Sequence, residues 1–157
     1  MQNNPYAGPL GDRDPLQALE QTPERIRQIV SHWTDAQWNG SYAPGKWSGR
    51  LILIHLAQTE LALTTRVRFA LSEDNYRAQP FSQDGWLETE RGTDGRTALD
   101  AYLALRRLNV LLFRSLTPEQ RRHTFQHPEY GELTPEWIAA QLAGHDLHHL
   151  AQLEQIK

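Results

Sequence analysis

Apolar residues recur at helical spacing in four stretches of the chain. The first covers about residues 14–33, with a restart or kink expected at Pro23, and the second covers about residues 48–71. The third covers about residues 97–116, and the fourth begins at Pro135. A period near 3.6 residues places these positions on one face of a helix, so the pattern predicts four long helices that share a core.

The tripeptide Thr-Pro-Glu occurs three times, at residues 22–24, 117–119 and 134–136. Its hydroxyl group can cap a helix, its proline is tolerated at the first helical position, and its acid lies near the positive end of the helix dipole. Each copy therefore predicts a helix start. Ser48 predicts another start by the same capping argument.

The connections between these helices differ in length. Residues 34–47 form a short connector, whereas residues 72–96 are polar and interrupted by one proline and three glycines. The longer segment is expected to act as a crossover with a short helical piece around residues 86–91. These connections predict an all-α four-helix bundle with a long crossover, in a single domain over residues 1–157. Residues 123–134 are expected to lead irregularly into the last helix.

Composition agrees with a helical protein and restricts its chemistry. The 157 residues include 22 leucines against 9 isoleucines and valines together, which favours helices over sheet. The chain has no cysteine. Disulfides, thiolate zinc sites, iron–sulfur clusters and cysteine nucleophiles are therefore excluded, and any metal must be held by nitrogen and oxygen ligands.

Charge and hydropathy argue against nucleic-acid and membrane partners. The 16 basic and 19 acidic side chains are interspersed and give a formal net charge of -3, so no basic face is expected to attract nucleic acid. Residues 1–14 do not have the pattern of a signal peptide. The longest mainly apolar run, residues 51–63, is too short and too polar to span a bilayer. These features predict a cytoplasmic location.

Two of the seven histidines share a face of the fourth helix. His145 and His149 are four residues apart, or about 40° on the helical wheel, at the edge of the core-facing stripe, whereas His148 points away from its centre. Such a pair can bind one divalent ion. His55 is the candidate third ligand because it lies within an apolar run. The alternative remains that these are buried imidazoles hydrogen-bonded to neighbours, with Glu60 or a carbonyl group as the partner of His55.

Several other polar and aromatic residues admit two interpretations. Asp146 could accept a hydrogen bond from a metal-bound histidine, but an exposed helix charge is the expected state. Arg106 and Arg107 could bind an anion, but such a pair is expected on a solvated face. Trp47 could line a pocket, although packing against its own helix is the simpler expectation.

Four motifs, in this order and separation, resemble those of the DinB/YfiT-like superfamily of four-helix proteins over nearly the whole chain. They are Pro-Gly-Lys-Trp-Ser at 44–48, Ile-His-Leu-Ala at 54–57 followed by Glu60, His-Pro-Glu-Tyr-Gly at 127–131, and Gly-His-Asp-Leu-His-His-Leu-Ala-Gln-Leu at 144–153. The resemblance implies a bundle of up-down-down-up topology. It also implies that His55, His145 and His149 converge on a divalent metal ion, with zinc or nickel as the ion.

The resemblance further implies an activity. Relatives with established activities transfer low-molecular-weight thiols or isomerise maleylpyruvate with a thiol cofactor, and many relatives are dimers, so a homodimer is one expected arrangement. A three-histidine site leaves open positions at which a thiol or water would lose its proton more easily. The leading hypothesis is transfer of a low-molecular-weight thiol to a small electrophile. The alternatives are a metal-dependent hydrolase of a small molecule and a non-catalytic, stress-associated bundle whose metal is structural or absent.

Overall fold

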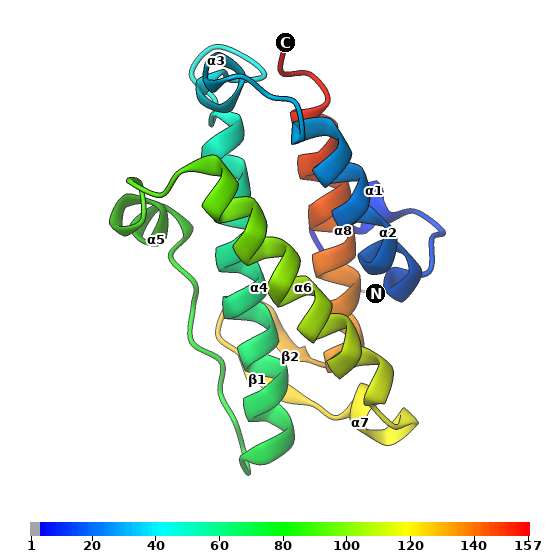
Figure 1. The fold of residues 1–157 in the computed structure, drawn as a ribbon. Helices are drawn as coiled ribbons and strands as arrows, with labels where there is room; N and C mark the ends of the chain where they lie inside the picture. The colour runs from blue at the N-terminus through cyan, green and yellow to red at the C-terminus, as the bar shows by residue number, and fades with distance from the viewer. Residues whose placement is uncertain (1–3) are drawn as a thin grey trace.

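Four long helices form the body of the computed structural model, which describes residues 4–157. They are α2 (Pro15–Val30), α4 (Gly49–Ser72), α6 (Gly95–Ser115) and α8 (Pro135–Leu153). Helices α4 and α6 run in the same direction, and α2 and α8 run opposite to them (Figure 1). This confirms the all-α bundle with up-down-down-up topology and a crossover between α4 and α6. Residues 1–3 lie outside the described residues. They belong to the segment 1–14, whose sequence lacks the pattern of a signal peptide.

Short elements complete the structure. They are α1 (Ala7–Leu10), α3 (Asp35–Asn39), α5 (Gln83–Thr89), α7 (Pro118–Arg122), β1 (Phe125–His127) and β2 (Gly131–Leu133). Strands β1 and β2 form an antiparallel hairpin where the sequence predicted irregular chain, with Phe125 opposite Leu133 and both side chains buried. Gly131 adopts a φ of 74°, which suits glycine at this turn. None of the helices within residues 4–157 is long and apolar enough to cross a membrane.

Most of the expected helix starts are present. Ser48 accepts a hydrogen bond from the backbone N–H of Leu51 at the start of α4, and Thr134 caps α8 in the same way. Thr117 caps the short helix α7 and forms a capping box with Gln120. These caps satisfy backbone donors that have no partner inside the helix.

The restart predicted at Pro23 is wrong, because α2 continues through it. Thr22 is buried and its hydroxyl donates to the carbonyl of Ala18 instead of capping a new helix. Pro23 has no N–H to donate to the carbonyl of Leu19, four residues earlier. That carbonyl accepts a hydrogen bond of 3.2 Å from Nη1 of Arg106. A tertiary contact therefore satisfies the group that the proline leaves free.

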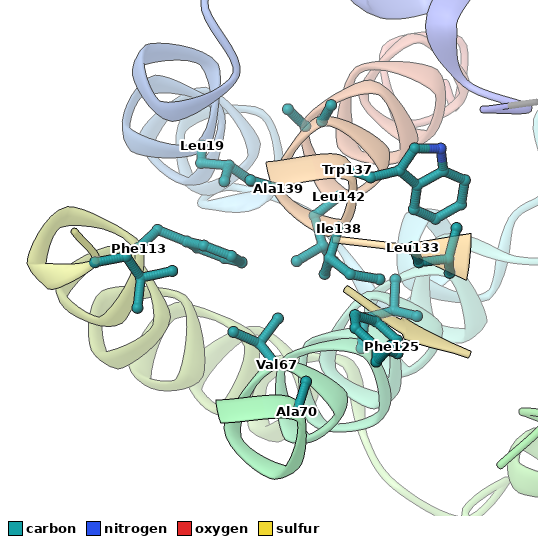
Figure 2. Packing of buried hydrophobic residues seen from close by; sticks show 14 of the residues in the cluster. Leu19, Val67, Ala70, Phe113, Phe125, Leu133, Trp137, Ile138, Ala139 and Leu142 are labelled. Carbon is teal, nitrogen blue, oxygen red and sulfur yellow. The ribbon is translucent and has the colours of Figure 1, made fainter. Parts of the chain in front are cut away.

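Two apolar clusters fill the bundle, one towards each end. Figure 2 shows the cluster that joins the four long helices to the hairpin, with Leu19, Val67, Phe113, Ile138 and Leu142 among its members. The other cluster includes apolar residues from the first half of α4 and from the end of the chain, among them Ile52, Leu53, Ile54, Leu56, Ala57, Leu150, Leu153 and Ile156. Between the clusters, α4 and α8 carry buried polar residues, namely His55, Gln58, Thr59 and Glu60 on α4 and His145, Asp146 and His149 on α8. The middle of the bundle is therefore the place for a polar site.

Candidate metal centre

Three histidines from two antiparallel helices converge in the middle of the bundle. Nε2 of His145 lies 2.8 Å from Nε2 of His55 and 3.1 Å from Nε2 of His149. His55 belongs to α4, whereas His145 and His149 are about one turn apart on one face of α8. Each side chain offers a ligand atom within 4.8 Å of those of the other two. The structure thus brings together the three histidines that the sequence grouped.

Burial keeps these imidazoles uncharged. It lowers the pKa of His55 to about 4 and, together with the nearby His55, the pKa of His149 to about 3. Burial also holds the pKa of His145 well below its ordinary value, and the neighbouring histidines add to that effect because like charges would repel. At neutral pH each ring is neutral and has one nitrogen lone pair available to a ligand.

A hydrogen bond orients His149. Its Nδ1 lies 2.7 Å from Oε1 of Gln152, which can only accept, so the ring proton is on Nδ1 and the lone pair of Nε2 faces the other histidines. Nε2 of Gln152 in turn contacts the hydroxyl of Tyr42 and Nε2 of His148. An acceptor at the second ring nitrogen is the usual way in which proteins fix a metal-binding histidine.

The donor set fits a divalent transition metal ion. Within residues 4–157 the group consists of three neutral imidazoles and no carboxylate, a set that suits zinc, nickel and similar ions and leaves coordination positions open. Nδ1 of His55 and Nδ1 of His145 are buried, and neither has a hydrogen-bond partner within residues 4–157. Burying polar rings in this way is costly unless something else stabilises them. An ion bound to the three Nε2 atoms would offset part of this cost, because among the described residues these atoms contact one another rather than a polar group elsewhere in the bundle. Such an ion would not give either Nδ1 atom a partner.

Other histidines lie outside this group. His148 is exposed on α8 and contacts Gln152, as its position on the helical wheel predicted. His127 is buried in β1, where its Nδ1 accepts hydrogen bonds from the backbone N–H groups of Glu129 and Tyr130.

Aromatic rings enclose the three histidines. Trp47 lies just before α4, and its ring centroid is 4.9 Å from that of His55 in α4. The same ring lies 6.2 Å from the His149 ring, and the two ring planes are nearly parallel. Trp47 therefore packs against its own helix and also covers the site. From the N-terminal segment, Tyr6 meets His145 edge-on with centroids 4.9 Å apart. These rings limit the access of water to the histidines.

Two recesses adjoin the histidines. The first, here named the Arg66 recess, is a cavity of about 240 Å³. Its lining includes His55 and His145 together with Arg66, His127 and Glu129. A molecule in this recess would touch two of the three converging rings.

The second recess, here named the Lys46 recess, is a cavity of about 390 Å³. Lys46, Trp47 and His149 contribute to its lining. Tyr6 and Gln83 line both recesses, so these two side chains mark where the recesses adjoin. The site therefore has two separate spaces that reach different members of the histidine group.

A buried ionic network lies beside the site. Arg106 is only 2% exposed, and its guanidinium group bonds to Oδ2 of Asp146 at 2.5 Å and to Oε1 of Glu60 through Nε at 3.1 Å and through Nη2. Tyr102 donates to Asp146 and Asn109 donates to Glu60. Because Glu60 is in α4 and Asp146 is in α8, Arg106 of α6 connects the two helices that carry the histidines.

The prediction that Arg106 and Asp146 are exposed charges is wrong. Asp146 is 1% exposed and accepts from Arg106 and Tyr102. The helical register contained a signal for this burial: Arg106 lies between Tyr102 and Phe113 on the apolar stripe of α6, and Asp146 follows Leu142 by four residues. The prediction from the sequence followed the general tendency of charged residues to be exposed instead of this position on the apolar stripe.

Comparison with known proteins assigns the chain to a family. A sequence model of the DinB superfamily matches residues 18–153. The chain belongs to the DinB superfamily. It is 28% identical over 144 residues to the protein named "Putative metal-dependent hydrolase YfiT" of Bacillus subtilis, over 90% of this chain and 81% of that protein. A relative from Oceanobacillus iheyensis, "Putative metal-dependent hydrolase OB0782", is 27% identical over 142 residues, which cover 90% of this chain and 83% of the relative.

Solved structures agree with this membership in the DinB superfamily. The structure of Bacillus subtilis YfiT, described as a probable metal-dependent hydrolase with an unusual four-helix bundle topology, matches with a TM-score of 0.83 at 28% identity. The match covers 90% of this chain and 83% of YfiT. The mycothiol-dependent maleylpyruvate isomerase matches with a TM-score of 0.70 at 12% identity, over 88% of this chain and 59% of the isomerase, a likeness of fold alone.

Proposed function

We propose that this protein is a metal-dependent enzyme that transfers a low-molecular-weight thiol to a small electrophile. Nε2 of His55, His145 and His149 would hold the ion, for which zinc or nickel is the expected identity. The observation that carries the proposal is the convergence of three uncharged imidazoles beside two recesses.

The chemistry of the reaction follows from the donor set and from the composition. A divalent ion in such a site lowers the pKa of a thiol or of water, so that deprotonation occurs near neutral pH. Because the chain has no cysteine, a nucleophilic sulfur has to arrive as part of a cosubstrate. The S–H bond breaks and its proton leaves to solvent. The sulfur then forms a bond to an electrophilic carbon of the second reactant, while the bond from that carbon to its leaving group breaks and the leaving group departs with the electron pair.

The residues around the histidines suit a reaction with two reactants. The Arg66 recess leads to His55 and His145, whereas the Lys46 recess leads to His149. Gln152 orients His149, and the ring of Trp47 shields both His55 and His149 from water. Two adjoining spaces allow a thiol and an electrophile to be bound and oriented together, which lowers the entropic cost of their reaction.

Hydrolysis is the second candidate reaction. It is supported by the names of the two relatives at 27–28% identity, each of which contains the words "Putative metal-dependent hydrolase". The same three histidines would then hold the ion, and water in place of a thiol would be the nucleophile. The two candidates differ in one measurable requirement, because only transfer consumes an added thiol.

The test is a turnover assay on purified protein loaded with zinc or nickel. A panel of low-molecular-weight thiols is combined with a panel of small electrophiles, and mass spectrometry detects thioether products. We expect product only when thiol and metal are both present. His55→Ala should abolish it, whereas His32→Ala, which changes an exposed histidine that lines neither recess, should retain it.

Each remaining outcome has a distinct meaning. Metal-dependent consumption of a substrate without thiol would replace transfer by hydrolysis. Absence of any metal-dependent turnover across the panel would overturn the enzymatic proposal and favour the non-catalytic, stress-associated bundle.

A further inference from the structure

Arg66 is a buried cation without an acidic partner. It is 6% exposed, yet no carboxylate oxygen within residues 4–157 lies within 4.0 Å of its guanidinium group. The only side-chain hydrogen bond it makes with the described residues runs from Nη2 to the carbonyl of Gln79, at 2.7 Å. A guanidinium group has five N–H donors, so most of them are left for a ligand. Burying such a charge is costly unless an anion accompanies it.

Arg106 is a buried arginine whose charge is balanced by acidic side chains of the protein itself. Its guanidinium group contacts two carboxylates and a backbone carbonyl. Arg66 is also buried, but it lines a cavity whose one acidic side chain among the described residues, the exposed Glu129, makes no ion pair with it. The difference suggests that the counter-ion of Arg66 is not part of the chain.

His127 presents a second donor to the same recess. Its Nδ1 accepts from the backbone N–H groups of Glu129 and Tyr130, at 3.2 and 3.4 Å, so its proton is on Nε2. Nε2 has no hydrogen-bond partner among the described residues. Burial and the charge of Arg66 both lower the pKa of His127, so the ring donates as a neutral N–H.

The charges around the recess select the ligand further. Arg66 is its one buried cationic side chain, and the exposed Glu129 contributes a negative charge to the lining. A single guanidinium group balances a carboxylate of charge -1 but leaves a phosphate dianion undercompensated. The cavity of about 240 Å³ also suits a small molecule rather than a polymer.

We propose that Arg66 and His127 form an anion subsite of the Arg66 recess, which binds a carboxylate group of the small electrophile beside His55 and His145. The identification of the bound molecule as the electrophile rests on the proposed function. The planar guanidinium group offers two parallel N–H donors to a carboxylate, and His127 supplies a further N–H. The subsite would hold the electrophile with one end fixed and the rest directed along the recess.

The test measures binding rather than turnover. Zinc-loaded protein is titrated with butyrate, with its uncharged analogue butyramide and with inorganic phosphate, while NMR follows the side-chain Nε–H of Arg66 and the backbone amides. We expect saturable shifts at Arg66 with butyrate, and affinities at least about tenfold weaker for butyramide, the size expected when hydrogen bonds to a charged group are lost. Phosphate should bind more weakly than butyrate.

Variants separate the subsite from general effects of charge. Arg66→Met should weaken butyrate binding about tenfold or more, Arg66→Lys should retain part of the affinity, and His127→Gln should cause a smaller loss. Arg107→Met removes an exposed arginine from α6 and should change nothing. If Arg66→Met does not fold, the comparison of butyrate with butyramide on the wild-type protein still decides.

Three results would overturn the subsite: equal affinity of wild type and Arg66→Met for butyrate, equal affinity for butyrate and butyramide, or tighter binding of phosphate. Its failure is distinguishable from failure of the proposed function. Loss of butyrate binding in Arg66→Met supports the subsite even if no thiol is ever transferred. If the protein transfers a thiol but its affinity for butyrate does not depend on Arg66, the proposed function stands and the proposed subsite is rejected.

Discussion

Among single residues, His55 is the histidine of the converging group that α4 contributes, whereas α8 contributes the other two. His145 and His149 lie on one helix and can approach each other by local geometry alone. The third nitrogen depends on how α4 packs against α8. Metal affinity is therefore a direct readout of this packing.

His55→Ala should lower the affinity for zinc at least about a hundredfold, because removal of a ligand costs no less than the loss of a residue that merely supports one. Competition with a chromophoric chelator measures the change. His32→Ala, at an exposed histidine that lines neither recess, is the matched control and should leave affinity near the wild-type value. Wild-type affinity in His55→Ala would show that the three histidines do not form the site.

Arg106 is the residue whose removal should most reduce stability. Arg106→Ala leaves Glu60 and Asp146 buried without their cation, so the free energy of unfolding should fall by about 3–5 kcal/mol. Arg107→Ala, at the exposed neighbouring position, should change it by no more than about 0.5 kcal/mol. Urea unfolding monitored by circular dichroism gives both values. Similar small effects of the two substitutions would contradict a tightly paired network.

Among the elements, α8 depends on a close approach of the N-terminal segment. A Cβ at Gly144 would lie 2.2 Å from the carbonyl oxygen of Tyr6, much closer than a real contact allows. Glycine at this position therefore lets Tyr6 reach His145 and cover both recesses.

Gly144→Ala should destabilise the protein by about 1–3 kcal/mol, because the backbone of Tyr6 has to move away. Gly8→Ala in α1 is a useful control, since a Cβ there meets nothing within 4 Å. It should be neutral or stabilising by up to about 1 kcal/mol. Urea unfolding of the two variants provides the comparison, and equal stabilities would argue against the close packing of the N-terminal segment on α8.

For the whole molecule, burial of the histidines links stability to pH. In the metal-free protein, His55 and His149 have pKa values of about 4 and about 3, against 6.5 for an ordinary histidine. Between pH 6.5 and pH 4 the unfolded chain therefore binds more protons than the folded chain at these positions. It follows that acid favours unfolding in this range.

The free energy of unfolding of chelator-treated protein should fall as pH falls from 6.5 to about 4, by on the order of 3 kcal/mol for His55 alone. The measurement is urea unfolding at several pH values. In His55→Gln the dependence should be shallower by that amount, because the substituted side chain does not titrate. An unchanged slope in the variant would show that His55 is not held as a buried neutral ring.

Helices were the most predictable part of the whole molecule. Their periodic apolar positions and the caps at Ser48 and Thr134 depend on residues within about two turns. The structure has α4 close to the predicted bounds, and α8 begins at Pro135 as predicted. The hairpin of β1 and β2 was not predicted, since two three-residue strands carry too short a pattern. Pro23 was misinterpreted because the group that compensates for it belongs to Arg106, 87 residues away from Leu19.

The sequence by itself determined four amphipathic helices, a neighbouring pair of histidines on one of them, and the absence of any cysteine. The grouping of His55 with that pair followed from the family resemblance, since spacing alone left it open. Only the tertiary structure decided that His55 and His145, 90 residues apart, have their Nε2 atoms in contact. It also decided that Arg106 is paired with acids and that Arg66 is not. Helical periodicity reports which face of a helix is apolar, whereas the partner of a buried charge depends on how distant helices pack.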